Sequence, residues 1–474
     1  HVKFSNARMK NEERSSDHSN WRAVVASVAG AIMVGVGALF FVYADRGATS
    51  FSSWLWASAP WAVFLLMPLG LLLILWLRSN VFPWTDGTGI PQTIAALEKG
   101  PGELRDRLLS PRVAAGKALL TALGLFSLLS IGREGPSVQL GACFMHLAGR
   151  WARFPVHLAE RGLIMAGGAA GIAAAFNTPI AGLVFAFEEI GRGFDKRNMG
   201  IVVRTVMLAC LFCMMFLGNY YSFGQIDAGR VLPLEFLSPG PWLAVLFIGA
   251  AGGLLGGLFS RLLLLLVPHV AGLIRKNFVP VALVVGLACA LLAWISNGAT
   301  LGTGHDAARA LVVQQSPEYL VTLPADEAAA LEAKRESIGP WYALQRALAS
   351  MLVLLTGIPG GLFDPSFSVG AGLGQLSADW FAWSGASLQG LILIWIVAYF
   401  SGVVQSPMTS FIIIIEMTGA IAFTLPLGVA SILAFEVSRR VCRVSIYEVL
   451  AQNFLRSGPE DQSAQRHRAA ENHG

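Results

Sequence analysis

Long apolar segments separated by short polar breaks dominate the pattern of this chain. A transmembrane helix needs about 20 mostly apolar residues. Segments that approach or exceed this length predict membrane spans over Val24–Tyr43, Trp54–Leu77, Val113–Ile131, Trp242–Val267, Val279–Ile295 and Ile421–Val437. Two further runs, Met207–Leu217 and Leu388–Phe400, are expected to belong to additional spans. The pattern therefore predicts an all-α polytopic membrane protein.

One break carries two charges inside hydrophobic sequence. The turn Gly132–Ser137 reads Gly-Arg-Glu-Gly-Pro-Ser and lies between two apolar segments. Irregular backbone at membrane depth is tolerated only where it is buried in protein or lines a cavity, and an ionisable residue there is a candidate functional group. Pro136 stands in the first turn of a predicted helix, where no N–H is needed. The free N–H groups of that turn would bind an anion, and Glu134 itself could occupy this position. The alternative is a satisfied ion pair between Arg133 and Glu134.

Other helices are predicted to be too short to span. Glycine and proline punctuation places them at Gln92–Lys99, Val138–Leu147, Leu163–Phe176, Pro179–Glu189, Ala307–Val313 and Pro407–Glu416. The loop Glu103–Arg112 is charged and expected to be exposed. The polar insert Ser316–Ser337 is expected to be helical from Ala325 to Arg335, and a basic tail that contains Tyr447 begins at Arg439. Short, interrupted helices of this kind are typical of transporters.

Composition supports the membrane assignment. The chain has 474 residues, of which 55% are hydrophobic and 13% are charged, whereas a soluble domain carries about 25% charged residues. The net charge of +5 lies mostly in the polar ends, so we interpret it as topology and lipid-surface charge and expect no nucleic-acid partner. The five cysteines lack metal-ligand spacing and are expected to be buried, inert thiols. No cleavable signal peptide is expected, because the polar segment His1–Arg22 precedes a full-length apolar span.

The glycine- and proline-containing breaks recur in the second half of the chain, which indicates an internal repeat. Gly87-Thr88-Gly89 matches Gly302-Thr303-Gly304, Pro136-Ser137 matches Pro365-Ser366, and Asn177-Thr178-Pro179 matches Gln405-Ser406-Pro407. In each half an acid lies nine positions after the proline of the last match: Glu188 after Pro179, and Glu416 after Pro407. Matched halves with broken helices at corresponding places predict a transporter whose site lies at the repeat interface. Chance similarity among glycine-rich membrane sequences is the alternative.

Four breaks have the pattern of helix N-termini that could face a common centre. They lie at Thr88–Pro91, Glu134–Pro136, Leu362–Pro365 and the turn before Tyr447. Helix N-termini supply partial positive charge and N–H donors without a tightly binding cation. An anion conductor needs such a site, because the ion must also leave. The hydroxyl groups of Thr88 and Tyr447 would add neutral donors.

These segments resemble the anion-site segments of the CLC family of chloride channels and transporters. The matching stretches are Gly87-Thr88-Gly89-Ile90-Pro91, Gly132-Arg133-Glu134-Gly135-Pro136, Gly361-Leu362-Phe363-Asp364-Pro365 and Tyr447, in the family's order. The resemblance covers about residues 24–450 and implies an inverted-repeat fold with broken, partly re-entrant helices. It also implies a homodimer with an anion pathway in each subunit.

The resemblance also implies roles for individual residues. Glu134 matches the external gating glutamate, which alternates between blocking the anion path and taking a proton. Glu189 matches the internal proton glutamate of many exchangers, although a solvated helix end is the alternative. Glu188 pairs with Glu416 in the repeat, which suggests a structural role for both. The anion-binding residues implied by the resemblance are Thr88, Gly89, Ile90, Glu134, Gly135, Leu362, Phe363 and Tyr447.

Three features depart from the common family pattern. Thr88 stands where many members have Ser, which keeps the hydroxyl donor and makes chloride selectivity plausible. Asp364 stands where a small or apolar residue is common, and it could cap the helix, weaken the site or point away from it. Only 27 residues follow Tyr447, so the cytoplasmic regulatory domains of many eukaryotic members are not expected. His146, His157, His269 and His305 are interpreted as interfacial or packing residues, and no metal site is expected.

The resulting hypothesis is a proton-coupled chloride antiporter of the bacterial inner membrane. Its expected parts are a cytoplasmic segment (1–22), a first membrane repeat (23–220), a second repeat (221–438) and a basic cytoplasmic tail (439–474). No cofactor is expected, and the partners are chloride as bound substrate ion, protons, the lipid bilayer and a second copy of the chain. A passive voltage- or pH-gated chloride channel of the same fold is the alternative. An intramembrane enzyme that uses Glu134 with Glu189 is a third candidate, but it would not explain the repeat or the four helix starts.

Overall fold

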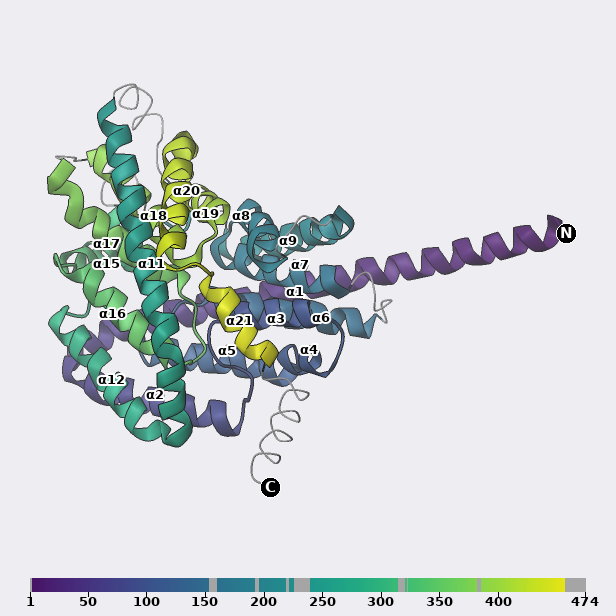
Figure 1. Ribbon diagram of the computed structural model, residues 1–474, viewed down its shortest axis with the longest axis horizontal. Helices are drawn as coiled ribbons and strands as arrows, with labels where there is room; N and C mark the ends of the chain where they lie inside the picture. Colours follow the sequence, from purple (N-terminus) through teal and green to yellow (C-terminus); the bar gives the residue numbers. More distant parts are fainter. Residues whose placement is uncertain are drawn as a thin grey trace.

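The protein is built from helices of very unequal length (Figure 1). This computed structural model describes the backbone of residues 2–152, 160–191, 196–218, 221–225, 239–313, 320–321, 323–381 and 385–456, and the side chains of most of them from residue 24 onward. His157 lies outside the described residues. Within the described ranges no extended strand forms, and the one β-bridge pairs Gly132 with Gly361. The all-α prediction is therefore confirmed.

The first half alternates long and short helices. Their bounds are α1 Val2–Ser58, α2 Val63–Asn80, α3 Ile90–Lys99, α4 Glu103–Leu108, α5 Pro111–Phe126, α6 Glu134–Trp151, α7 Glu160–Phe176, α8 Pro179–Phe185 and α9 Lys196–Leu217. A π-helical turn, Ala186–Ile190, extends α8. A short 3-10 turn, Pro60–Ala62, separates α1 from α2.

The second half repeats this alternation of long and short helices. Its helices are α11 Pro239–Lys276, α12 Phe278–Ile295, α13 His305–Val313, α15 Ala325–Glu336, α16 Tyr342–Leu355, α17 Phe363–Phe381, α18 Gly385–Val404, α19 Pro407–Thr418, α20 Thr424–Val441 and α21 Ile446–Arg456. In the described part of the chain, seven segments are long and apolar enough to cross a membrane: Val24–Ser58, Pro60–Asn80, Glu103–Phe126, Asn198–Leu217, Pro239–Lys276, Phe278–Ile295 and Ile421–Val441.

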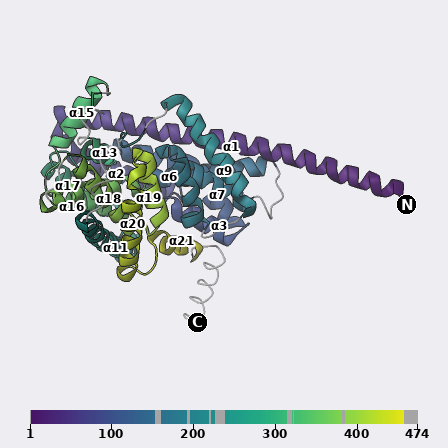
Figure 2. The same cartoon turned by 90° about the horizontal axis from the view of Figure 1, so that it is seen from above.

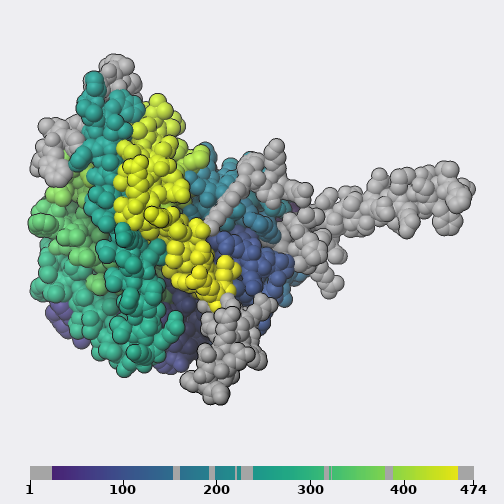
Figure 3. Space-filling model, viewed as in Figure 1, coloured from purple at the N-terminus to yellow at the C-terminus, as the bar shows by residue number. Residues whose placement is uncertain are grey.

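Long helices enclose a centre of short, broken ones. α1 runs along one edge of the molecule (Figure 2), α2 packs on α12, and α11 packs on α20. On the face shown in Figure 3, α11 and α20 lie side by side and α21 crosses from them toward α3. The helices inside are almost wholly buried: α3 from Ile90 to Leu97, and most of α6. Broken helices are thus shielded from lipid, as irregular backbone at membrane depth requires.

Small residues let the inner helices approach closely. α6 crosses α7 where Gly141 meets Gly167, and a methyl group on either glycine would collide with the other's carbonyl. Gly171 meets the backbone of Ser137 in the same way. Helix contacts in membranes favour such residues because apolar side chains gain nothing by leaving lipid. The close approach predicted for the Ala- and Gly-rich segment Leu163–Phe176 is confirmed.

Three predicted boundaries were wrong. The first span continues to Ser58, so Trp54 belongs to it, and the predicted second span Trp54–Leu77 crosses the break at Pro60. The segment Glu103–Arg112 is partly helical, and Arg105 is buried because its Nε donates to the Ala96 carbonyl at 2.9 Å. Apolar periodicity does not mark the end of a helix, and an arginine can be buried once its donors are satisfied.

The sequence repeat has a counterpart in backbone conformation. Asn177 and Gln405 both take positive φ, 59° and 60°, immediately before the matched Thr178 and Ser406. Those two residues have nearly identical dihedrals, φ −125° and ψ 75° against φ −124° and ψ 81°. A positive φ, as at Asn177 and Gln405, is uncommon for residues other than glycine. Their recurrence supports a structural repeat rather than chance similarity.

One acid of each half bonds to the start of a helix in the other half. The Glu188 carboxylate accepts hydrogen bonds from the N–H groups of Met408 and Thr409, at 2.9 and 2.7 Å, at the start of α19. The Glu416 carboxylate accepts from the N–H groups of Ile180 and Ala181, at 3.0 and 2.7 Å, at the start of α8. Each acid satisfies N–H groups that the opposite helix cannot bond internally. The structural role predicted for this pair is confirmed.

We expect Glu188→Ala to destabilise the protein. The substitution leaves two N–H groups at the start of α19 without their acceptor, and such a loss costs about 1–3 kcal/mol. Glu416→Ala should act similarly at α8. The measurement is the thermal unfolding temperature of the purified protein in detergent, with the exposed Glu332→Ala on α15 as the control. Equal unfolding temperatures for the Glu188 and Glu332 variants would contradict this role.

Candidate anion site

Two glycines join the halves of the molecule at its centre. The Gly132 N–H donates to the Gly361 carbonyl at 2.7 Å, and the Gly361 N–H donates to the Gly132 carbonyl at 2.5 Å. This antiparallel bridge lies directly before α6 in one half and before α17 in the other. The starts of these two helices therefore face each other in the protein interior.

The helix starts provide unused N–H donors. The first intrahelical bonds come from the N–H groups of Thr93 in α3, Ser137 in α6, Ser366 in α17 and Val449 in α21. The N–H groups before these residues have no carbonyl one turn back to bond. Prolines occupy the first turns of α3, α6 and α17, at Pro91, Pro136 and Pro365, where their missing N–H costs nothing. The four helix N-termini predicted from the sequence are present.

Glu134 is the first residue of α6 and is fully buried. Its carboxylate lies over the glycine bridge, because a Cβ atom added to Gly361 would come within 2.5 Å of Glu134 Oε2, and one added to Gly132 would collide with the same oxygen. The ion pair that Arg133 makes is with Asp45 of α1, at 3.4 Å. The carboxylate oxygens of Glu134 accept no hydrogen bond from Arg133. The alternative of a satisfied Arg133–Glu134 pair is thus not what the structure contains.

The start of α3 packs against the start of α6. A Cβ atom on Gly135 would approach the Thr88 carbonyl to 2.5 Å, and one on Gly89 would approach the Gly135 carbonyl to 2.6 Å. Gly89 has a φ of 105°, a conformation that glycine adopts readily. Thr88 Oγ1 is buried and makes no hydrogen bond to a described residue. Thr88, Gly89, Ile90, Glu134 and Gly135 are therefore brought together.

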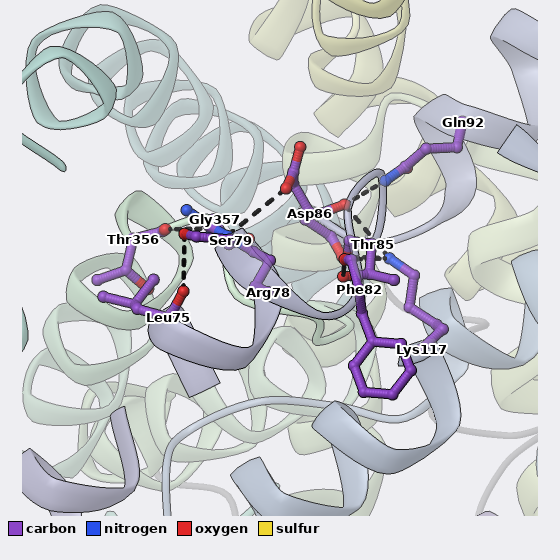
Figure 4. A network of polar contacts seen from close by, with 11 residues as sticks. Leu75, Arg78, Ser79, Phe82, Thr85, Asp86, Gln92, Lys117, Thr356 and Gly357 are labelled. Atoms are coloured by element: carbon purple, nitrogen blue, oxygen red, sulfur yellow. Dashed lines mark hydrogen bonds and ion pairs between the residues drawn. The ribbon is translucent and has the colours of Figure 1, made fainter. Parts of the chain in front are cut away.

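A polar network fixes the loop that carries Thr88 (Figure 4). The buried Lys117 ammonium of α5 donates to the carbonyls of Thr85, Asp86 and Gly87, at 2.9, 3.3 and 2.9 Å. Gln92 of α3 donates to the Asp86 carbonyl as well. Three carbonyls that converge on one cation hold the loop by its backbone. Sequence reasoning missed Lys117, although a lysine within an apolar span was a signal that could have found it.

The same loop is tied to the second half. The Gly87 N–H donates to the Gly357 carbonyl at 2.8 Å. Arg78 Nη1 donates to the carbonyls of Thr356 and Gly357, at 2.8 and 2.7 Å, and Arg78 Nε lies 3.5 Å from Asp86 Oδ1. The loop before α3 is therefore positioned by α2, α5 and the segment before the glycine bridge.

The remaining predicted residues are buried near these helix starts. Leu362 and Phe363 are 1% exposed, and the Phe363 ring packs edge-on against Phe185 and Phe400. Tyr447 is the second residue of α21, which packs on α3. Its hydroxyl is buried, makes no hydrogen bond to a described residue and lies within electrostatic range of both Glu134 and Glu189.

Glu189 lies in the π-helical turn after α8 and is 5% exposed. Ser406 Oγ donates to Glu189 Oε2 at 2.5 Å. The alternative of a solvated helix end does not describe this carboxylate. Short π-helical turns are often found at functional sites, and this one turns Glu188 toward α19 and Glu189 toward Ser406.

Two histidines differ from their predicted packing roles. His305 Nδ1 lies 3.0 Å from Asp364 Oδ1, and His146 Nε2 lies 3.2 Å from Asp106 Oδ1. Neither acid is near its histidine in the sequence, which is why the spacing did not reveal the pairs. One oxygen of Asp364 therefore faces His305 of α13.

Comparison with known proteins identifies the family. Residues 69–439 match the voltage gated chloride channel family. The chain belongs to the CLC family. The H(+)/Cl(-) exchange transporter ClcA of Cronobacter sakazakii is 27% identical over 431 residues, which cover 86% of this chain and 84% of that protein. A protein of Ralstonia nicotianae, named as a ClcB-like chloride channel protein, is 27% identical over 414 residues, 83% of this chain and 87% of that protein.

Solved structures of CLC proteins share the fold. A slow cyanobacterial Cl-/H+ antiporter matches with a TM-score of 0.72 at 23% identity, over 92% of this chain and 98% of that chain. A CLC-type fluoride/proton antiporter matches with a TM-score of 0.70 at 20% identity, over 90% and 96% of the two chains. This CLC protein is a multi-pass protein of the bacterial inner membrane with the inverted-repeat fold. The chloride-binding role of the residues above stays a prediction.

We expect Lys117→Met to weaken chloride binding about tenfold. The Thr88 loop would be held less firmly, and the expected loss of binding free energy is about that of one net hydrogen bond. Methionine keeps the length of the side chain but cannot hold the three carbonyls. The measurement is chloride titration of the purified CLC protein by calorimetry, with the exposed Lys276→Met as the control. Equal affinity in the two variants would show that the ammonium does not position the site.

Proposed function

We propose that this protein exchanges chloride for protons across the membrane, with Glu134 as external gate and proton acceptor. The observation that carries the proposal is the position of the Glu134 carboxylate: it is buried beside the glycine bridge that joins the starts of α6 and α17, and the start of α3 packs against the start of α6. Helix N-termini attract anions. A carboxylate that stands in such a place competes with chloride for it.

The competition couples the two ions. When chloride enters, it displaces the Glu134 carboxylate from its place at the helix starts, where the helix dipoles favour a negative charge. A displaced carboxylate with poorer solvation takes a proton more readily. When the proton leaves, the charged carboxylate returns and closes the anion path. One side chain would thus alternate between an anion and a proton as its partner.

Glu189 supplies the inner end of the proton route in this proposal. Its carboxylate is buried, is held by Ser406 and lies in electrostatic range of Tyr447, as Glu134 does. An ionisable group buried at membrane depth is costly, so its retention favours a functional role. The relatives named as H(+)/Cl(-) exchangers support the same conclusion.

A passive chloride channel is the second candidate. The relative named as a chloride channel protein favours it, and the same helix N-termini would serve a channel. A buried Glu189 has no task in a purely passive anion path, which is why exchange is preferred. An intramembrane enzyme is not supported, because the similar proteins are transporters and channels.

We expect a chloride gradient to drive protons in the opposite direction in liposomes that contain the purified protein. Chloride and pH electrodes read together test this, and net proton movement against its own gradient would require coupling. Glu134→Ala should abolish proton movement and spare chloride flux, because alanine leaves the path open and carries no proton. Glu189→Gln should also reduce proton movement and spare chloride.

The exposed Glu436→Gln on α20 is the matched control for these variants and should exchange as the unmutated protein does. Chloride flux without proton movement in the unmutated protein would establish the channel instead. Proton movement that persists in Glu134→Ala would remove Glu134 from its proposed role while leaving exchange in place.

We also propose that the protein is a homodimer, as its resemblance to the CLC family implies. Exposed apolar side chains lie on α8, on α19, on the 3-10 turn Ile421–Phe423 and at the start of α20, namely Ile180, Met408, Ile421 and Leu425. Because α19 packs on both α8 and α20, these side chains would offer a second copy one apolar surface. We expect light scattering in detergent to give twice the mass of the chain, and Ile421→Glu to lower it. A monomeric mass for the unmutated protein would contradict the proposal.

A further inference from the structure

A second buried acid lies beside Glu134. Asp364 is the second residue of α17, is 0% exposed, and has its carboxyl group within hydrogen-bonding reach of the Glu134 carboxyl group. The glycine bridge explains this contact, because it places the starts of α6 and α17 against each other. Apart from this mutual contact, both Glu134 oxygens and Asp364 Oδ2 make no hydrogen bond to any described residue.

The other oxygen of Asp364 is held by a histidine. His305, the first residue of α13, has Nδ1 at 3.0 Å from Asp364 Oδ1. The His305 ring packs on Phe223, with ring centroids 5.0 Å apart, and its side chain is 13% exposed. With the ring proton on Nδ1, His305 donates to Oδ1, and Oδ2 is left without a hydrogen bond to any described residue other than the contact with Glu134. Side-chain exposure thus falls from His305 to the two acids.

The surrounding charges do not neutralise both acids. Arg133 lies close but is paired with Asp45 at 3.4 Å. Among the described residues, Asp306 and Arg309, which follow His305 in α13, are further charged groups near it. Two carboxylates in contact inside a protein repel each other strongly, and such pairs commonly hold one proton between them. One proton lets either acid donate to the other and satisfies the oxygens that lack partners.

We propose that Glu134 and Asp364 share one proton, that Asp364 is therefore a second proton-binding residue of the exchange, and that His305 positions it. The proposal rests on the exchange function proposed above. On protonation, one proton enters the pair from water and forms an O–H bond on one carboxyl group, which donates to the other carboxylate. On release, that O–H bond breaks and the proton returns to water, so the pair gains or loses a single charge.

The two contacts of Asp364 have opposite effects on proton binding by the pair. The neighbouring charge of Asp364 favours a proton on Glu134, so removing this charge lowers the external pH at which the pair is half protonated. The His305 donor stabilises the ionised form of Asp364, so removing this donor raises the same pH. Because the two acids titrate together, the measured midpoint belongs to the pair and not to either residue.

The test is the external-pH profile of coupled chloride and proton flux in liposomes. Asp364→Asn keeps the size of the side chain and an oxygen acceptor for His305, but it cannot hold the shared proton. We expect its profile to move to lower pH by about one unit or more, the scale of shifts between adjacent carboxyl groups. His305→Phe keeps an aromatic ring against Phe223 and removes the donor, and its profile should move to higher pH.

Asp306→Asn is the matched control, because it removes the same charge one residue from His305 on a half-buried side chain. The shift of its pH profile should be only a small fraction of the shift seen for Asp364→Asn. In the background of Glu134→Ala, Asp364→Asn should leave the pH dependence of chloride flux unchanged, since its effect acts through Glu134.

The outcomes separate this inference from the function on which it rests. An unmutated protein that moves chloride without protons would overturn both. If the unmutated protein exchanges but Asp364→Asn keeps its pH profile, only proton sharing is overturned. Equal shifts in the Asp306 and Asp364 variants would show a general charge effect and overturn it as well. Opposite shifts for Asp364→Asn and His305→Phe would support it, because damage to the fold would not reverse sign.

Discussion

Two hydrogen bonds between Gly132 and Gly361 hold together the centre on which the other parts of the site depend. At membrane depth a backbone that leaves the helix must bond within the protein, because lipid offers it no partner. The two glycines meet this need for each other and at the same time bring the starts of α6 and α17 face to face. A side chain at either position would occupy the space of the Glu134 carboxylate. The bridge therefore fixes the helix starts and also leaves space for the Glu134 carboxylate.

The repeat supplies the scaffold, and departures from the repeat supply the chemistry. Glu188 and Glu416 each accept hydrogen bonds from a helix start in the other half, and Asn177 and Gln405 share an uncommon backbone conformation. Symmetry ends at the helix starts. The first half places Arg-Glu-Gly between its bridge glycine and proline, where the second half places Leu-Phe-Asp. Both halves thus contribute one acid, but at positions offset by one residue, which lets Glu134 and Asp364 approach from opposite sides instead of coinciding.

Local sequence predicted the parts of the fold that depend on local chemistry. Gly and Pro punctuation located the starts of α3, α6, α8, α17 and α19, because these residues determine where a helix can begin. The boundary between α1 and α2, at Ser58 and Pro60, was predicted wrongly because an apolar run does not reveal a break within it. The partners of His305, Lys117 and Arg105 could not be predicted either. His305 meets an acid 59 residues away, and Lys117 bonds to backbone carbonyls that carry no sequence signature. Tertiary packing decides such contacts.

Two of the buried cations near the candidate site are occupied by other partners. Arg133 faces Asp45 of α1, and Lys117 donates to three carbonyls at the back of the Thr88 loop. A full positive charge in contact with chloride inside a low-dielectric interior would bind it strongly, and a transported ion must also be released. In the proposed anion site, the remaining donors are N–H dipoles and the hydroxyls of Thr88 and Tyr447. The cations would then position the site while weaker, neutral donors bind the ion, which suits the proposed exchange of chloride with a carboxylate.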